Sequence, residues 1–324
     1  MDEAQQVADF RDRHGLDGLI DVHTHFMPKS VMDKVWGYFD SAGPLVGREW
    51  PITYRHAEEE RVERLRRFEV RRFTAMLYPH KPAMAAWLNS WAVDFAARTP
   101  DCLHTATFYP EPEAGDYVAA ALEHGARVFK SHIQVGDYDP NDPLLDPVWG
   151  LLEDAGVPIV IHCGSGPAPG AHTGPGPIAA LLDRFPRLAL IVAHMGMPEY
   201  REFLELAEKY PRVHLDTTMA FTDFTQESMP FPEDELPRLR ALGSKVLFGS
   251  DFPEHPVPVH PSARGGRTAR SRQRMGPRGV LGQRAKTGAI RRTAAVGTRR
   301  LPFDPGHPKG KPAARASRSG LVSD

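Results

Sequence analysis

The chain has 324 residues, of which 41% are hydrophobic and 25% are charged, and its formal net charge at pH 7 is −1. This length suits one barrel-type domain of about 250 residues as well as two smaller domains. The chain has no apolar run of about 18 residues, so we expect no membrane span. It has two cysteines, Cys102 and Cys163, and an N-terminus without a basic start followed by an apolar stretch. We therefore expect a cytoplasmic protein without a disulfide framework.

The small net charge conceals a division of the chain near residue 254. Residues 1–254 contain 24 Lys and Arg against 39 Asp and Glu. Residues 255–324 contain 16 Lys and Arg against two Asp, with no Tyr or Trp and no sustained hydrophobic periodicity. We predict a folded domain over 1–254 and a disordered, Arg/Gly/Pro-rich tail over 255–324.

Short apolar runs alternate with helical patterns in the first 253 residues. We expect strands within 18–23, 73–79, 103–110, 126–132, 157–164, 188–196, 212–218 and 245–253. Apolar spacing of three to four residues predicts helices within 56–70, 83–98, 116–125, 144–156, 177–186, 198–211 and 234–243. The alternation predicts a parallel sheet, and eight strands favour a closed (β/α)₈ TIM barrel of the α/β class. A Rossmann sheet is the weaker alternative, because no G-x-G-x-x-G motif follows the first run. Residues 30–55 are expected to form a long loop over the active face.

The first run leads into the sequence DVHTH, which places two histidines one residue apart. Successive side chains of a strand point to opposite faces, so His23 and His25 point the same way, as does Asp21. Taken alone, the pair is equally compatible with two ordinary polar residues at the end of a strand.

Other predicted strands also end in potential metal ligands. His162 ends the fifth run, His194 the sixth and Asp251 the eighth, and Lys130 and His132 close the fourth. Because the C-terminal ends of barrel strands meet at one mouth, we expect these side chains to converge. Imidazole and carboxylate groups suit Zn²⁺ and related divalent cations, so the pattern predicts a metal site at the mouth.

This ordered set resembles the amidohydrolase superfamily. The likeness rests on the H-x-H pair, the histidines after strands five and six, and the sequence GSDFP after strand eight, and it spans about residues 19–253. It is closest to the amidohydrolase-related branch with aminocarboxymuconate-semialdehyde decarboxylase-like enzymes. The resemblance implies a metal, usually zinc, held by His23, His25, His162 and Asp251.

The resemblance also implies roles for two neighbouring residues. His194 corresponds to the catalytic acid/base or substrate-polarising histidine. The carboxylated bridging lysine of binuclear relatives could only be Lys130, but we favour a mononuclear site in which Lys130 contacts the substrate or the ligands.

Two reactions of a small organic substrate are compatible with such a site. In the first, a metal-activated water hydrolyses an amide, lactone or ester, with Asp251 holding the water and taking its proton while His194 protonates the leaving group. The second is non-oxidative decarboxylation of an aromatic or unsaturated acid. Arg48 or Arg55 would favour a carboxylate substrate, and His172, in the Gly/Pro-rich segment 164–177, is a further candidate for substrate contact. Asp216 could reach the mouth, although a buried structural role is the commoner one for such a residue.

The basic tail has an explanation in the genetic code. A barrel needs a helix after strand eight, and no helical pattern follows residue 253. If the codons for residues 254–259 are read one nucleotide later, they can encode the sequence Asn-Ile-Pro-Tyr-Pro-Tyr. This sequence resembles the one that follows SDFP in the family. In the same shifted frame, the codons for Met275 and Gly276 must give Trp. The codons for residues 282–288 can then encode Gly-Asn-Ala-Arg-Lys-Leu-Gly, which is similar to the family's closing helix.

We therefore predict that residues 255–324 are an out-of-frame tail caused by a one-nucleotide frameshift, which resequencing the gene would test. A barrel without its final helix could be catalytically inactive, a third possibility for this chain. Nucleic-acid binding by the tail ranks last, because no aromatic residues are interleaved with its basic residues. A homo-oligomer is compatible with the sequence.

Overall fold

The computed structural model describes residues 2–43, 47, 49–50 and 52–255. The described strands are all parallel and fall into two hydrogen-bonded groups, β1-β2-β3 and β4-β5-β6-β7-β8-β9. They are β1 (Leu19–Asp21), β2 (Val70–Thr74), β3 (Cys102–Leu103), β4 (Thr105–Thr107), β5 (Val128–His132), β6 (Ile159–His162), β7 (Leu190–Val192), β8 (Val213–Asp216) and β9 (Val246–Leu247). Because β3 and β4 are separated by one residue, they act as two halves of one barrel strand.

The two groups of strands join into a closed ring. The backbone N–H of Val22 donates to the carbonyl of Phe248 at 3.0 Å. Further along, Thr24 and Phe252 form a parallel bridge. These contacts connect the segments that follow β1 and β9, which confirms the predicted (β/α)₈ barrel. Each of the eight predicted runs contains strand residues, although β2 begins three residues before the run at 73–79.

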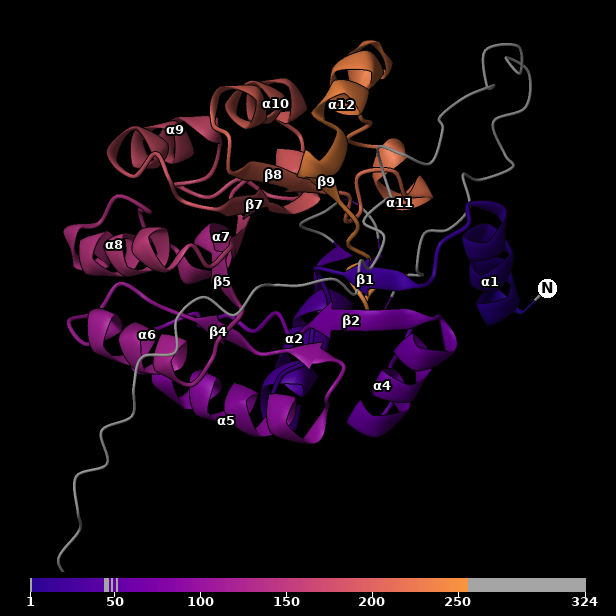
Figure 1. The fold of residues 1–324 in the computed structure, drawn as a ribbon, viewed down its shortest axis with the longest axis horizontal. Helices are drawn as coiled ribbons and strands as arrows, with labels where there is room; N and C mark the ends of the chain where they lie inside the picture. The colour runs from indigo at the N-terminus through magenta and orange to yellow at the C-terminus, as the bar shows by residue number, and fades with distance from the viewer. Residues whose placement is uncertain (1, 44–46, 48, 51, 256–324) are drawn as a thin grey trace, which may run out of the picture. The chain divides into compact units, whose positions relative to one another are not determined.

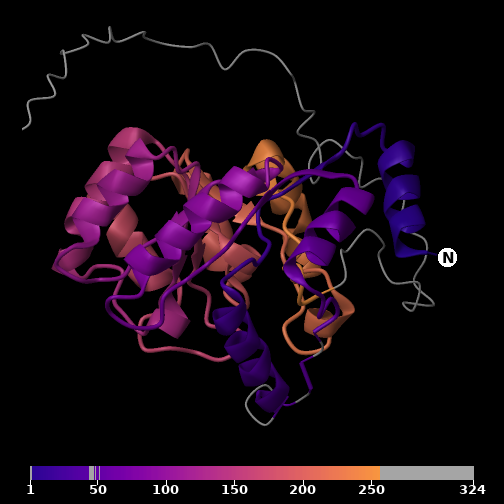
Figure 2. The same ribbon diagram turned by 90° about the horizontal axis from the view of Figure 1, so that it is seen from below.

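Helices surround the strands, as Figures 1 and 2 show. Seven of them overlap the predicted helical segments: α4 (Glu58–Arg67), α5 (Ala85–Arg98), α6 (Ala114–Glu123), α8 (Asp146–Ala155), α9 (Pro175–Arg184), α10 (Tyr200–Lys209) and α12 (Leu236–Leu242), of which α6 and α9 begin two residues before the segments at 116–125 and 177–186. Short helices α7 (Ile133–Gly136) and α11 (Asp223–Gln226) follow β5 and β8. None of the helices in the described part of the chain is long and apolar enough to cross a membrane.

Besides the short α7 and α11, two longer helices were not predicted. α1 (Glu3–Arg13) precedes the barrel, and its Val7 belongs to the same buried cluster as Leu19 and Phe248. α2 (Lys29–Ser41) follows β1, so the prediction of a loop over 30–55 was wrong for residues 30–41. Its Met32 is buried in a core cluster, whereas Val31, Val35, Tyr38 and Phe39 line a cavity.

Side chains alternate between two apolar layers along the strands. Ile159 and Ile161 of β6 belong to the large cluster that includes the helices, whereas Val160 belongs to a small cluster with Val128 of β5. Because residues two apart in a strand share a face, Lys130 lies on the same face of β5 as Val128. This interior layer therefore ends, at the C-terminal mouth, in titratable side chains.

The tail 255–324 lies, except for its first residue, outside the described residues, so the frameshift and the boundary at residue 254 stay predictions.

Candidate metal centre

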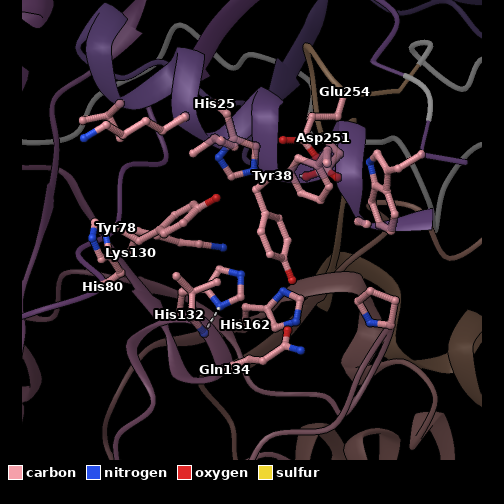
Figure 3. Close-up of a pocket in the computed structure, with 18 of the residues that line it drawn as sticks. His25, Tyr38, Tyr78, His80, Lys130, His132, Gln134, His162, Asp251 and Glu254 are labelled. Atoms are coloured by element: carbon pink, nitrogen blue, oxygen red, sulfur yellow. Dashed lines mark hydrogen bonds and ion pairs between the residues drawn. The ribbon is translucent and has the colours of Figure 1, made fainter. Parts of the chain in front are cut away.

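The predicted ligands lie in one cavity at the mouth of the barrel. It has a volume of about 860 Å³. Figure 3 shows several of its lining side chains pointing inward. The predicted residues that line it are His23, His25, Lys130, His132, His162, His194 and Asp251. The structure therefore brings together the four predicted ligands, the predicted acid/base and the buried lysine.

The H-x-H pair meets Asp251 at a single oxygen. The Asp251 Oδ1 atom lies 3.1 Å from His25 Nε2 and 3.5 Å from His23 Nε2. Each histidine is held by its other nitrogen, because His25 Nδ1 lies 2.8 Å from the Met76 carbonyl and His23 Nδ1 lies 2.9 Å from Asp216 Oδ2. Histidines that ligate metals are usually anchored in this way through the nitrogen that faces away from the cation.

His194 and His162 form a second pair in the same cavity. His194 Nε2 lies 3.1 Å from His162 Nδ1. The remaining nitrogens face carbonyls, with His194 Nδ1 3.3 Å from Thr218 O and His162 Nε2 3.1 Å from Gly166 O. His162 also stacks on His132, with ring centroids 4.0 Å apart. Four imidazoles, from the segment after β1, the end of β6 and the turn after β7, thus line the same cavity as Asp251.

The sequence did not decide whether Asp216 reaches the mouth of the barrel or has a buried structural role. Asp216 is completely buried at the end of β8, and besides His23 Nδ1 it accepts hydrogen bonds from two backbone N–H groups. Its Oδ1 atom accepts from His194 N at 2.9 Å and from Thr218 N at 3.1 Å. One carboxylate therefore holds the imidazole of His23 and the backbone of His194.

His23, His162 and His194 are uncharged near neutral pH. Burial, reinforced by the Lys130 ammonium, lowers the pKa of His23 to about 3. Burial also lowers the pKa of His194 and holds that of His162 well below its usual value. Neutral imidazoles retain a lone pair on one nitrogen, which is the form that binds cations.

At neutral pH the carboxylates of Asp251 and Asp216 are ionised, and Lys130 is largely protonated. Burial alone would raise the pKa of Asp251, but the hydrogen bond and electrostatic interaction with His25 outweigh it and hold the pKa well below its usual range. Burial likewise opposes ionisation of Asp216, yet its interactions with His23 bring its pKa down to about 2. Burial lowers the pKa of Lys130 to about 8, against the opposing charges of Asp216 and Asp251.

Local backbone conformation also singles out the site. His194 and Asp251 have φ of 55° and 65° in the left-handed region, which is costly for residues with a side chain. Strain of this kind, about 1–3 kcal/mol for each residue, is concentrated at functional sites in proteins. The glycine of the GSDFP motif has a separate reason: a Cβ at Gly249 would lie 2.2 Å from Thr218 Oγ1 and 2.9 Å from His23 Cβ.

The predicted substrate contacts have different outcomes. Lys130 lines the cavity, with Nζ 3.3 Å from His23 Nε2. Arg55 and His172 are not among the described residues that line it, and Arg55 instead pairs with Asp40 of α2. Arg48 lies outside the described residues.

Sequence reasoning missed other parts of the cavity. One face of α2 lines it, through Ser30, Val31, Lys34, Val35, Tyr38 and Phe39. Tyr78, which follows β2, places its ring 5.8 Å from that of His25. Glu254 also lines the cavity, and burial together with the charge of Asp251 raises its pKa well above the usual value. The α2 spacing of three to four residues was the available signal.

Three of these residues meet the geometric requirement for a cation site. His23, His194 and Asp251 offer ligand atoms that all lie within 4.8 Å of one another, and all three are buried. Two neutral imidazoles and an ionised carboxylate are a donor set that suits Zn²⁺ and similar divalent ions. The residues present therefore fit a metal, while the ligand roles of His25 and His162 stay predictions.

Comparison with known proteins identifies the family. The amidohydrolase family model matches residues 20–280. The chain belongs to the amidohydrolase family. This confirms the resemblance to the amidohydrolase superfamily on which the predicted ligand set was based, and members of this superfamily typically depend on divalent metals.

Solved structures of similar fold include other amidohydrolase-like barrels. An uncharacterised TIM-barrel protein from Bordetella bronchiseptica is 19% identical, with a TM-score of 0.60, and the match covers 74% of this chain and 88% of that one. The 5-carboxyvanillate decarboxylase from Sphingomonas paucimobilis is 16% identical, with a TM-score of 0.51 and coverage of 75% and 91%. A protein described as amidohydrolase II is 20% identical, with a TM-score of 0.52 and coverage of 74% and 89%. No curated protein matches the chain. At these identities the likeness concerns the fold.

Proposed function

We propose that this amidohydrolase-family protein is an enzyme that hydrolyses a small organic amide, lactone or ester with the help of a divalent cation, Zn²⁺ or a related ion. One observation carries the proposal: His23, His194 and Asp251, all buried, offer ligand atoms within 4.8 Å of one another in a cavity that is open to a substrate. Of these, His23 and Asp251 would hold the cation together with the predicted ligands His25 and His162, which line the same cavity, and His194 would lie beside the cation as the acid–base group. When bound, such a cation lowers the pKa of a coordinated water to about 7 and polarises a carbonyl.

Asp251 is the proposed proton acceptor. Its pKa is held well below the usual range, so the carboxylate is ionised at neutral pH. Its Oδ1 atom already faces two imidazoles at the mouth of the barrel. A carboxylate in this position can orient the attacking water and take its proton as the water adds to the carbonyl.

The His194–His162 pair is suited to hold that proton and return it to the leaving group. The two rings make three contacts, to Thr218 O, to each other and to Gly166 O. A hydrogen bond needs one proton in each contact, and two neutral imidazoles supply only two. Taking up a third proton therefore completes the set of hydrogen bonds, so the pair can accept a proton during the reaction and donate it from His194.

Lys130 is the proposed binding group for the developing oxyanion. Its side chain is 1% exposed and lines the cavity beside His23. With a pKa of about 8, its ammonium group remains largely protonated at pH 7. A preorganised buried donor stabilises charge that appears in the transition state more strongly than water does.

An activity screen tests the proposal. Protein reconstituted with Zn²⁺ or Mn²⁺, and the same protein in EDTA, are assayed for acid release from panels of lactones, aryl esters and amides. We expect metal-dependent hydrolysis that falls at least about 100-fold in His194→Asn, in line with the loss of a general acid–base group. The control is His124→Asn, an exposed histidine whose Nδ1 atom faces the Ala120 carbonyl.

The same screen also distinguishes the proposed hydrolase from the alternative functions. Release of CO₂ from a panel of aromatic and unsaturated acids, without hydrolysis, would replace the proposal with the carboxy-lyase reaction. A fully metal-loaded protein that does neither would favour an inactive barrel. Equal hydrolysis by wild type and His194→Asn would contradict the assigned role of His194.

A further inference from the structure

The cavity is lined by buried polar side chains at its floor and by exposed side chains at its entrance. At the floor, His23, Lys130 and Asp251 are at most 4% exposed. At the entrance, Tyr38 and Trp87 line the cavity but expose 57% and 49% of their surface. A bound molecule would therefore reach from a buried polar floor to an open rim.

The middle of the cavity is apolar and roomy. Its walls include Val31 and Val35 of α2, Met84 before α5, and Met197 and Met219 from the segments after β7 and β8. A volume of about 860 Å³ lies near the upper end of the roughly 300–1,000 Å³ range of small-molecule pockets. This space can hold an aryl or alkyl body larger than one ring.

The entrance carries two cations. Lys34 and Lys81 are exposed and line the cavity, and within the described part of the chain neither forms an ion pair. The acidic residues of α2 are already engaged, because Asp33 pairs with Lys29 at 2.6 Å and Asp40 pairs with Arg55.

The carboxylates that line the cavity do not lie at its entrance. Among the described lining residues they are Asp251 and Glu254, both of which are buried. The two lysines at the entrance are therefore available to an anionic group of the substrate.

We infer that the substrate is an amphipathic organic anion. Its reacting bond lies at the metal centre, its apolar body lies against the valines and methionines, and a negatively charged group at the far end is held by Lys34 and Lys81. The inference rests on the proposed function only in taking this cavity as the substrate site. It assigns the anion-binding role to these lysines rather than to Arg55, whose guanidinium is paired with Asp40.

Two fluorescent probes with the same ring system test the inference. 8-Anilinonaphthalene-1-sulfonate carries an anionic group, and N-phenyl-1-naphthylamine is its uncharged counterpart. Both are titrated into the full chain in EDTA, so that binding does not depend on metal or on catalysis. We compare wild type with Lys34→Gln/Lys81→Gln and with the control Lys29→Gln, which lies on the same helix but does not line the cavity among the described residues.

The two lysines should strengthen binding of the anionic probe alone. Each exposed ion pair contributes about 0.2–1 kcal/mol, so removing both should make the double variant bind the sulfonate about two- to thirtyfold more weakly. Binding of the uncharged probe should be unchanged, which also shows that the cavity is intact, and Lys29→Gln should match wild type. Equal sulfonate affinity in wild type and the double variant would overturn the inference. Because no turnover is measured, this result is distinguishable from failure of the hydrolysis assay.

Discussion

Replacing Asp216 by Asn should weaken metal binding although Asp216 itself is not a proposed ligand. In the wild type, Oδ2 accepts the Nδ1–H proton of His23 at 2.9 Å, which leaves the Nε2 lone pair facing Asp251 and Lys130. In Asp216→Asn, the amide oxygen can keep the backbone N–H groups of His194 and Thr218, so the NH₂ group faces His23. That group donates to Nδ1 and places the imidazole proton on Nε2, where a cation would need the lone pair.

The size of the effect follows from residues in other proteins that hold a metal-ligating histidine through its second nitrogen. Loss of such a partner typically weakens metal binding about 10- to 100-fold, or about 1.4–2.7 kcal/mol. The metal-free variant should also be less stable. The pKa of Asp216 is about 2, below the unfolded value of 3.8. This difference contributes about 2 kcal/mol of stability above pH 3.8, which is lost as the pH falls through about 2.

A competition titration of Zn²⁺ against a fluorescent chelator measures the affinity. The matched control is Asp21→Asn, a buried carboxylate whose Oδ1 atom accepts from the backbone N–H groups of His23 and Ser250 rather than from an imidazole. The control should bind Zn²⁺ within about threefold of wild type. If Asp216→Asn also binds within about twofold of wild type, Asp216 does not control the orientation of His23 and the reasoning fails.

Two further predictions concern stability. Burial raises the pKa of Asp21 to about 7. The contribution of this carboxyl group to the free energy of unfolding is therefore complete below pH 3.8 and is lost as the pH rises through about 7. Urea unfolding in EDTA should therefore show Asp21→Asn gaining about 2–3 kcal/mol relative to wild type between pH 5 and pH 7; a difference that does not change with pH would contradict this. Gly249→Ala places a Cβ 2.2 Å from Thr218 Oγ1, and should cost about 1–3 kcal/mol in unfolding free energy and displace His23. The control Gly150→Ala, which meets no atom within 4 Å inside α8, should be neutral or stabilising, and equal stability of the two variants would refute the steric argument.

Strand-end positions account for what the sequence predicted about the site. His162 ends β6, and His194 and Asp251 follow β7 and β9. Parallel barrel strands carry such positions to one mouth whatever the lengths of the connecting helices. Local pattern was therefore enough to assemble residues that are more than two hundred positions apart.

Ring orientation and ion pairing could not be predicted in the same way. The tautomer of His23 depends on Asp216, which comes from another strand. Arg55 was predicted to contact the substrate, but its partner Asp40 belongs to α2, a helix whose apolar face lines a cavity. Both outcomes depend on contacts between distant elements rather than on local spacing.

The metal content of the purified chain tests the central claim most directly. We expect about one divalent ion per folded chain after dialysis, measured by inductively coupled plasma mass spectrometry, and less than about a tenth of that in Asp251→Asn. Circular dichroism must show that both proteins are folded. A folded wild type that retains no divalent ion and binds none on titration, or an Asp251→Asn variant that retains a full equivalent, would contradict the claim that these residues form a cation site.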